Sequence, residues 1–231
     1  MISIKNVTKS YNNNLVLDIR DLNIKAGEIC GIVGNNGAGK TTMFSLILDL
    51  IQADTGDIKS EDNIVSESEE WKSYTGSYIN ESFLIDFLTP DEYFSFIADL
   101  YDWNQGMLTS FLVQFEELFN REILGVNKYI RDLSMGNQKK VGIVAALIGD
   151  PSVLILDEPF SNLDPTTQNR LKGLLNDSKK ADRAIIISSH DLNHVHDVSD
   201  RIIVLEKGLI IKDIAKSDNS MQELKTYFQI A

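Results

Sequence analysis

A glycine-rich loop directly behind an apolar strand constrains this chain more than any other feature. The strand is expected over residues 29–33, and the loop after it reads Gly34-Asn35-Asn36-Gly37-Ala38-Gly39-Lys40-Thr41-Thr42. Because the glycines carry no side chains, successive backbone N–H groups can curl around a phosphate, and Lys40 adds a positive charge. Apolar residues at helical spacing over 43–50 predict a helix whose positive dipole end faces the anion. The sequence therefore predicts nucleotide binding, with Thr41 offering an oxygen to magnesium.

Composition narrows the classes of partner. The chain has 231 residues, 43% of them hydrophobic, which is enough for one large domain or a domain with an inserted lobe. Its net charge of −12 argues against a nucleic-acid partner. No cleavable signal is visible at Met1, and apolar stretches such as residues 141–148 are far below the roughly 18–20 residues that span a bilayer. Any membrane role is therefore expected to come through a partner, and the single cysteine, Cys30, is expected to be a buried core residue.

The first half of the chain predicts strands around the loop and then a helical lobe. Alternation over residues 2–7 and 15–19 predicts two hairpin strands covering one side of the nucleotide core, whereas the polar run 59–70 is expected to be an exposed connection. A capping box with proline at the first helical position, residues 89–92, predicts the start of a helical lobe. An aromatic stripe from Phe111 to Phe119 continues it and indicates packing rather than a cofactor site.

The second half alternates between strand and helix. This alternation predicts a parallel α/β arrangement, a hairpin turn at residues 206–208 and a closing helix over 221–230. The strands are expected over 153–156, 184–187 and 202–205, and the helices over 168–175 and 194–198. A further helix is expected after Ser134, which is suited to be its N-cap.

Two carboxylates, Asp157 and Glu158, follow the apolar strand 153–156. Asp157 is expected to hold magnesium, directly or through water, and Glu158 to polarise the attacking water as general base. A solvated strand end is the alternative, and the phosphate loop argues against it. His190 also follows an Ile-rich strand and is expected beside the nucleotide. His194 could share a helix face with His190 as a metal pair, but no third ligand is specified, so His194 and His196 are expected to be exposed.

Five motifs in this order resemble the ATP-binding subunit of an ABC transporter over about residues 2–212. They are the phosphate loop, the Leu133–Gln138 signature, the strand Val153–Glu158, the segment Ser161-Asn162-Leu163-Asp164, and His190. The resemblance implies an α/β fold with a P-loop NTPase (RecA-like) core, an antiparallel β subdomain and an inserted α-helical signature subdomain. It implies a single cassette, residues 1–231, divided into 1–80 (β subdomain and phosphate loop), 81–134 (helical lobe) and 135–231 (remaining α/β core and C-terminal segment).

The resemblance also implies a site shared between two subunits. Ser134 and Gly136 would contact the γ-phosphate of ATP held by the phosphate loop of a second cassette, and His190 would contact the γ-phosphate and the attacking water. Met135 and Asn137 depart from the commonest signature, Leu-Ser-Gly-Gly-Gln, and are similar to variants in drug- and peptide-exporting members. Asp164 would belong to the loop that connects the two sites across the dimer.

Two further positions, Tyr11 and Glu81, correspond to site residues of the family. Tyr11 stands where the family stacks an aromatic ring on adenine, although an edge-strand tyrosine is the rival interpretation. Glu81 stands where a glutamine normally reaches magnesium and the attacking water; a carboxylate can coordinate the ion but cannot donate a hydrogen bond. The expected ligand sets are therefore catalytic Glu158 and His190; for ATP, Tyr11, Gly34, Asn35, Asn36, Gly37, Ala38, Gly39, Lys40, Thr41, Thr42, Ser134 and Gly136; and for Mg²⁺, Thr41, Asp157 and Glu81.

The implied function is an ATPase subunit that powers transport, with export favoured, on the cytoplasmic face of the cell membrane. Its partners would be ATP, a second cassette, identical or homologous, and an integral membrane subunit. The lobe 81–130 would form a groove for a cytoplasmic helix of that subunit, which Phe83 and Phe87 either line or support as core residues. The alternatives are an ABC-type ATPase not coupled to transport, which chain length and acidic charge disfavour, and a regulatory cassette with poor turnover, which the intact catalytic residues disfavour. Substrate and direction of transport are not specified by the sequence.

Overall fold

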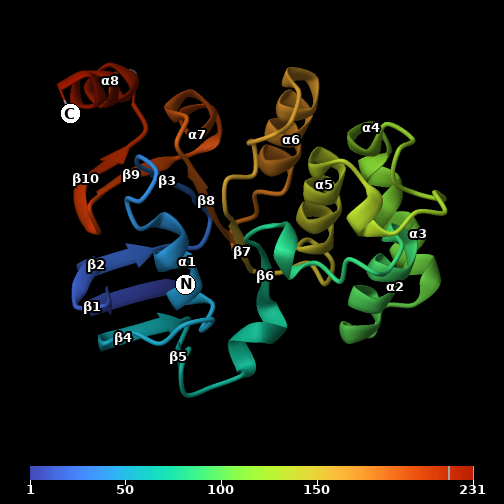
Figure 1. Ribbon diagram of the computed structural model, residues 1–231, viewed down its shortest axis with the longest axis horizontal. Coiled ribbons are helices and arrows are strands. Elements are labelled where there is room, and N and C mark those ends of the chain that lie inside the picture. The colour runs from blue at the N-terminus through green and yellow to red at the C-terminus, as the bar shows by residue number, and fades with distance from the viewer. Residues whose placement is uncertain (218, 231) are drawn as a thin grey trace.

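Two β-sheets organise the chain, and helices surround them (Figure 1). The computed structural model describes residues 1–217 and 219–230, without the side chains of residues 226–230. The strands are β1 (Ile2–Tyr11), β2 (Asn14–Ile24), β3 (Ile29–Val33), β4 (Thr55–Ser60), β5 (Asn63–Ile64), β6 (Thr75–Tyr78), β7 (Val153–Leu156), β8 (Ala184–Ser189), β9 (Arg201–Glu206) and β10 (Leu209–Ala215). The helices are α1 (Lys40–Ile47), α2 (Pro90–Leu100), α3 (Gln105–Leu112), α4 (Glu116–Phe119), α5 (Met135–Ala145), α6 (Pro165–Asp177), α7 (Leu192–Val198) and α8 (Ser220–Ile230).

The larger sheet has six strands in the order β10-β9-β3-β8-β7-β6. All neighbours are parallel except β10, which returns antiparallel beside β9. Every residue of β3, β7 and β8 is buried, because both faces of this sheet are covered, and such strands read as continuous apolar runs. The parallel α/β prediction is confirmed, as are the hairpin turn before Leu209 and the closing helix α8.

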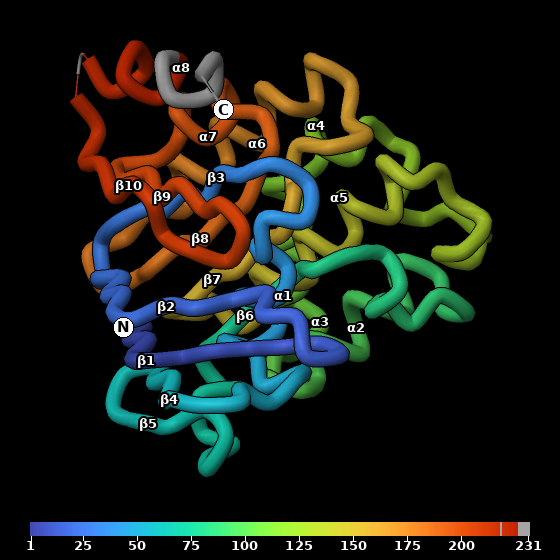
Figure 2. Tube along the Cα trace, turned by 60° about the vertical axis from the view of Figure 1, so that its left-hand side comes forward, coloured from blue at the N-terminus to red at the C-terminus, as the bar shows by residue number. Residues whose placement is uncertain are grey.

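The smaller sheet is antiparallel, in the order β2-β1-β4-β5, and confirms the expected hairpin of β1 and β2. Figures 1 and 2 place α1 between this sheet and the parallel strands, and one apolar cluster joins all three. The prediction that residues 59–70 form an exposed connection is wrong in part. The chain turns back after Ser60 to pair β5 with β4, the Val65 N–H bonds to the Ile58 carbonyl at 3.0 Å, and the Val65 side chain is buried.

The helices α2 to α4 form a lobe at one end of the molecule, with α5 between it and the rest of the chain (Figure 1). The capping box is confirmed: the Thr89 hydroxyl accepts from the Glu92 N–H, and the Glu92 carboxylate accepts from the Thr89 N–H. The aromatic stripe packs in the lobe, with ring centroids 4.8 Å apart for Phe111–Phe115 and 6.1 Å for Phe115–Phe119. A single apolar cluster joins the lobe to α5 and to the parallel sheet, and the division into segments 1–80, 81–134 and 135–231 stays a prediction.

In the part of the chain that the structure describes, no helix is both long and apolar enough to span a membrane.

Candidate nucleotide-binding site

The phosphate loop leaves β3 at the centre of the parallel sheet and opens α1. Gly34 is buried so tightly that a Cβ there would lie 2.3 Å from the Leu205 carbonyl oxygen, whereas Gly37 and Gly39 have φ values of 81° and 106°. Such positive φ values favour glycine. No side chain caps the first turn of α1, so its N–H groups are open to a ligand. The loop therefore has the backbone conformation and the helix end that an anion site needs.

Lys40 joins the loop to the catalytic strand end. Its ammonium donates to the Gly34 carbonyl at 2.7 Å and lies 3.4 Å from Glu158 Oε1. The Lys40 side chain is only 7% exposed, so this charge is held beside the loop. A phosphate bound by the loop would therefore contact the Lys40 ammonium, which also lies next to the Glu158 carboxylate.

Thr41 and Asp157 meet although 116 positions separate them. The Thr41 hydroxyl donates to Asp157 Oδ2 at 2.6 Å, and the Ser188 hydroxyl donates to Asp157 Oδ1. Burial raises the pKa of Asp157, and the hydrogen bonds from Ser188 and Thr41 oppose that rise. The Thr41 hydroxyl oxygen and Asp157 Oδ2 are therefore close enough to bind the same cation.

This donor set fits Mg²⁺. No group of three or more His, Cys, Asp or Glu side chains suited to a metal occurs in residues 1–217 and 219–225, whose side chains the structure describes. The protein thus supplies only part of a coordination shell, with hard oxygen donors at Thr41 and Asp157. Mg²⁺ is commonly held by one or two protein oxygens together with waters and phosphate oxygens.

Glu158 is fixed at both its backbone and its side chain. Its φ of 47° lies in the left-handed region, which costs a residue with a Cβ about 1–2 kcal/mol. The Glu158 N–H donates to Ser188 Oγ at 2.8 Å, and the Glu158 carbonyl accepts from Lys139 Nζ at 2.9 Å. Glu158 Oε2 lies 2.9 Å from His190 Nδ1. The structure thus brings together the carboxylate and the histidine that the sequence predicts as catalytic residues.

Glu81 lies on the turn after β6, beside α5. Its Oε1 atom is 3.9 Å from Lys139 Nζ and has no hydrogen-bond partner, although it is buried. Burial raises the pKa of the nearby Tyr78, and the neighbouring Glu81 carboxylate adds to that rise. The structure therefore pairs Glu81 with Lys139, and the predicted role of Glu81 as a magnesium ligand stays a prediction.

Ser134 and Gly136 lie at the N-terminal end of α5. Ser134 is exposed and caps the helix as predicted, because its hydroxyl accepts from the Asn137 N–H at 3.3 Å. A Cβ at Gly136 would lie 3.1 Å from the Asn162 carbonyl, so the signature borders the segment after Glu158. In that segment Asp164 caps α6, accepting from the N–H groups of its first turn.

Tyr11 ends β1 at the turn of the first hairpin and is 46% exposed. The Lys9 ammonium lies 5.5 Å from its ring centroid. The same hairpin reaches the phosphate loop, since a Cβ at Gly39 would lie 3.1 Å from the Val16 carbonyl. Adenine stacking on Tyr11 stays a prediction.

Three residues that fix the site were not singled out from the sequence: Ser188, Lys139 and Ser161. Ser188 could have been noticed as a hydroxyl within the Ile-rich strand β8, and Lys139 as a charge one turn into an apolar helix. The exposure predicted for His194 and His196 is wrong, because both are partly buried. The His194 ring lies on Phe160, with centroids 5.1 Å apart, and His196 Nε2 is 3.1 Å from Ser220 Oγ.

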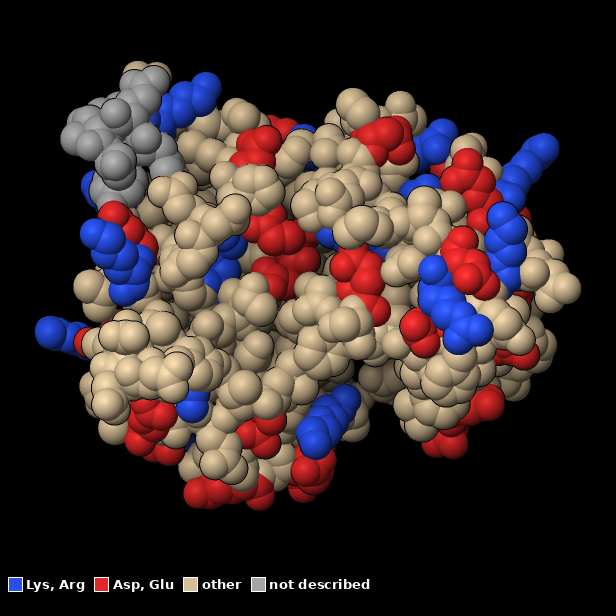
Figure 3. Space-filling model, in the orientation of Figure 1, with Lys and Arg blue, Asp and Glu red and all other residues tan. Residues whose placement is uncertain are grey.

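Acidic side chains gather in a hollow at the centre of the face drawn in Figure 3, over the ends of β7 and β8. Asp157 and Glu158 come directly after β7 in the chain. A triphosphate entering this hollow would meet repulsion unless cations compensate. Lys40 supplies one positive charge, and a divalent cation would supply the remainder.

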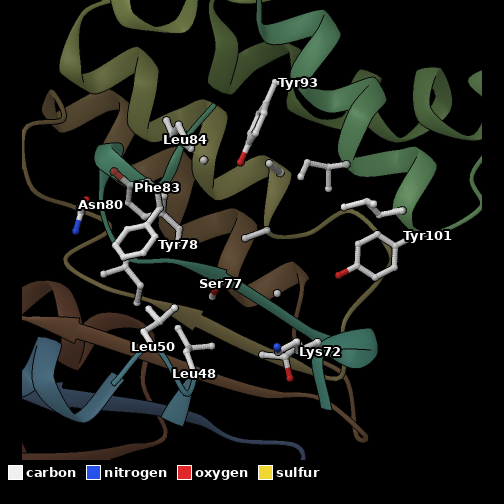
Figure 4. Close-up of a pocket in the computed structure, with 18 of the residues that line it drawn as sticks. Leu48, Leu50, Lys72, Ser77, Tyr78, Asn80, Phe83, Leu84, Tyr93 and Tyr101 are labelled. Atoms are coloured by element: carbon white, nitrogen blue, oxygen red, sulfur yellow. The ribbon is translucent and has the colours of Figure 1, made fainter. Parts of the chain in front are cut away.

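A groove lies between β6, α5 and α2, away from the phosphate loop (Figure 4). It has a volume of about 330 Å³, and its lining includes Tyr78 at the end of β6, Phe83 from the turn after β6, Tyr93 and Leu100 from α2, and Leu50 after α1. Phe83, Leu100 and Leu50 are 56%, 66% and 46% exposed, so apolar surface is open at this groove. Phe83 thus lines the groove as expected, whereas Phe87, 61% exposed, is not among its lining residues.

Comparisons with known proteins agree on one family. The family model described as "ABC transporter" matches residues 17–161. The chain is 32% identical over 236 residues to the lantibiotic transport ATP-binding protein SrtF of Streptococcus pyogenes, covering 97% of this chain and 95% of SrtF. It is 30% identical to the ABC transporter ATP-binding protein NatA of Bacillus subtilis, covering 91% and 88%. An import protein, the osmoprotectant ATP-binding protein OsmV of Salmonella typhimurium, is 27% identical, covering 92% and 58%.

Solved structures share the fold. An ATP-binding subunit of an ABC transporter superposes with a TM-score of 0.84 at 23% identity, covering 100% of this chain and 98% of the other. A dimeric ATP-binding cassette, described as a post-hydrolysis state bound to ADP and Pi, superposes with a TM-score of 0.80, also at 23% identity, covering 93% and 98%. The α/β P-loop NTPase fold expected from the sequence is confirmed.

Proposed function

The chain belongs to the ATP-binding subunits of ABC transporters and is an ATPase, and from this premise we propose that it powers the movement of a substrate through a separate transmembrane subunit. The observation that carries the proposal is the meeting of the phosphate loop, Asp157 and the Glu158–His190 pair at one edge of the sheet. A site with these parts binds a triphosphate and directs water at its last phosphate.

The residues divide the chemistry between them. The N–H groups of the loop and the Lys40 ammonium hold the phosphates, while Glu158 accepts the proton of the attacking water. His190, bonded to the same carboxylate, orients that water and contacts the γ-phosphate. When bound at Thr41 and Asp157, Mg²⁺ would neutralise charge on the phosphate oxygens. The buried position of Asp157 keeps this cation next to the loop.

A second cassette, identical or homologous, would complete the site. Ser134 is exposed at the N-terminal end of α5, where its hydroxyl accepts a hydrogen bond from the Asn137 N–H. We propose that Ser134 and Gly136 face the γ-phosphate held by the partner cassette, with Tyr11 stacking on adenine in the first. The complete ATP site would then form only when two cassettes close over ATP.

The groove beside Tyr78 is the proposed dock for a cytoplasmic helix of the membrane subunit. Its open apolar residues Phe83, Leu100 and Leu50 suit the apolar face of an amphipathic helix. The chain would thus lie on the cytoplasmic face of the membrane through this contact. We favour export as the direction, because Met135 and Asn137 resemble exporter signatures and SrtF is a lantibiotic transport protein.

The decisive test is Glu158→Gln in the purified protein. The variant keeps the shape of the side chain but removes its basicity, so MgATP binding should persist while steady-state hydrolysis is lost and a closed dimer accumulates. The matched control is Glu67→Gln, an exposed glutamate in the loop before β6, which should hydrolyse ATP at the normal rate. Normal hydrolysis by Glu158→Gln would refute the general-base assignment.

The alternative function, a regulatory cassette with poor turnover, can be tested with the same purified protein. A regulatory cassette would bind MgATP but show no single-turnover hydrolysis in the unmodified protein. The docking of the membrane subunit in the groove is tested by two further variants. Phe83→Asp should lose the membrane protein that copurifies with the chain while retaining ATP binding, whereas Phe87→Asp should retain that protein. Equal retention by both variants would refute the groove as the docking site.

A further inference from the structure

Lys139 is a buried cation that reaches the catalytic strand end from the signature helix. It lies one turn into α5 and is 4% exposed. Its ammonium donates to the Glu158 carbonyl at 2.9 Å and to Ser161 Oγ at 2.6 Å, and Ser161 Oγ donates to the same carbonyl at 2.9 Å. The Ser161 N–H donates to that carbonyl as well, at 3.2 Å, so three donors converge on the carbonyl of a residue held in the left-handed region, and Lys139 is the charged one among them.

Glu81 supplies the opposite charge on the other side of Lys139. Its Oε1 atom lies 3.9 Å from Lys139 Nζ and is buried without a hydrogen-bond partner. The Glu81 side chain as a whole is 24% exposed, and the nearby ammonium compensates the lost solvation of its buried oxygen. The distance of 3.9 Å between Lys139 Nζ and Glu81 Oε1 is longer than a hydrogen bond, so the interaction of Lys139 with Glu81 is electrostatic.

The same cluster reaches the groove through Tyr78. The Lys139 ammonium lies 5.8 Å from the Tyr78 ring centroid, and the Tyr78 carbonyl accepts from the Asp157 N–H at 2.8 Å. Tyr78 lines the groove and begins the turn that carries Glu81 (Figure 4). One side of the cluster is therefore the groove, and the other is the backbone of Asp157 and Glu158.

We propose that Lys139 is a positioning residue that, held by Glu81, fixes the backbone of Glu158 and so ties the turn at the groove to the rate of hydrolysis. The proposal rests on the proposed role of Glu158 as general base. If the carbonyl of Glu158 loses the Lys139 ammonium, its only charged donor, the left-handed backbone relaxes and the carboxylate moves away from the bound water. Nucleotide binding, which depends on the loop and α1, is left in place.

The test is a double-mutant cycle with Lys139→Met and Glu81→Gln, read out as kcat and KM for ATP. Lys139→Met removes the donor and leaves Glu81 unpaired, so kcat should fall by about 30-fold or more, with KM changed by less than about threefold. Glu81→Gln should lower kcat by about tenfold. The double variant should be at least about fivefold more active than the product of the two single effects, because neither charge of the pair is then left without its partner.

Two variants separate positioning from general damage to the fold. Lys139→Arg keeps a donor and a positive charge and should recover most of the kcat lost in Lys139→Met. Lys140→Met is the matched control, since Lys140 is also buried on α5 but its charge interacts with Glu122 and Asp164 and not with Glu81 or Glu158. It should leave kcat within about twofold of the unmodified chain.

The proposal is overturned if the double variant equals the product of the single effects, or if Lys140→Met lowers kcat as much as Lys139→Met. If Lys139→Met does not fold, the Glu81→Gln and Lys139→Arg variants still decide. A normal kcat in Glu81→Gln refutes the pair, whereas a tenfold loss at unchanged KM supports it. Failure here leaves the Glu158→Gln result standing, so the two hypotheses can fail independently.

Discussion

The hydroxyl of Ser188, on β8, donates a hydrogen bond to the carboxylate of Asp157, which follows the neighbouring strand β7. The same hydroxyl oxygen accepts from the Glu158 N–H at 2.8 Å. One buried serine therefore orients the proposed magnesium ligand and the backbone of the proposed general base. Its position follows from the parallel pairing of β7 with β8, which places the ends of both strands at one edge of the sheet.

Ser188→Ala should weaken both Mg²⁺ binding at Asp157 and catalysis by Glu158. Removing a hydrogen bond to a charged group costs about 1.5–3 kcal/mol, so we expect kcat to fall on the order of tenfold and the Mg²⁺ requirement to rise. Magnesium titrations of ATP hydrolysis would measure both effects. Ser60→Ala is the matched control, since Ser60 is equally buried but its hydroxyl has no hydrogen-bond partner. Equal activity of the two variants would contradict the proposed role of Ser188.

Lys40→Ala should weaken MgATP binding more than it affects folding. The ammonium loses its contacts to the Gly34 carbonyl and Glu158, and the bound phosphates lose a positive charge. With about 2–3 kcal/mol lost from charge-assisted contacts, the Kd for MgATP should rise on the order of 100-fold. Calorimetric titration measures this directly. Lys72→Ala, an exposed lysine in the turn before β6, should bind normally, and an unchanged Kd in Lys40→Ala would remove the phosphate-loop assignment.

Asp150 should contribute a pH-dependent part of the stability. Its partial burial raises the pKa, but hydrogen bonds and charges from Lys180 and the buried Arg183 outweigh this and hold the pKa below its usual value. A lowered folded-state pKa gives stability that is present above the unfolded value and is lost as pH falls through the folded value.

Asp150→Asn should therefore lower the free energy of unfolding by about 1 kcal/mol near pH 7, because the carboxylate is largely exposed. The difference from the unmodified chain should stay constant from pH 8 to about 5 and shrink below about pH 4, where the unfolded aspartate is protonated. Urea unfolding across this range measures it. Asp99→Asn, at an exposed site on α2, should show no such difference, and a constant difference down to pH 3 would refute the interpretation.

Two helical glycines should respond in opposite directions to alanine. A Cβ at Gly142 on α5 would lie 2.3 Å from a ring carbon of the buried Tyr78, whereas a Cβ at Gly173 on α6 meets nothing within 4 Å. Helix propensity favours both substitutions by about 1 kcal/mol, but overpacking at Gly142 costs about 1–3 kcal/mol. Gly173→Ala should raise the melting temperature and Gly142→Ala should lower it. A rise in both would mean that Tyr78 moves freely.

Local patterns predicted most of the elements. The capping box at Thr89, the N-cap at Ser134 and the strand before Asp157 are each determined by residues a few positions apart, so the chain itself carries the signal. The phosphate loop is of the same kind, since its glycines and its lysine are consecutive. Prediction failed where the outcome depends on residues distant in the chain. The polar run after Ser60 contains Val65, whose side chain is buried because the chain turns back to pair with β4.

The phosphate loop, the two carboxylates after β7 and the histidine after β8 could all be identified along the chain, and they indicate the kind of chemistry. Their surroundings depend on the folded sheet: Ser188 bonds to Asp157, Lys139 donates to the Glu158 carbonyl, and Glu81 faces Lys139. These contacts follow from the order of the strands. In the sheet, β3, β8, β7 and β6 are neighbours, and this juxtaposition sets which buried polar groups must satisfy one another.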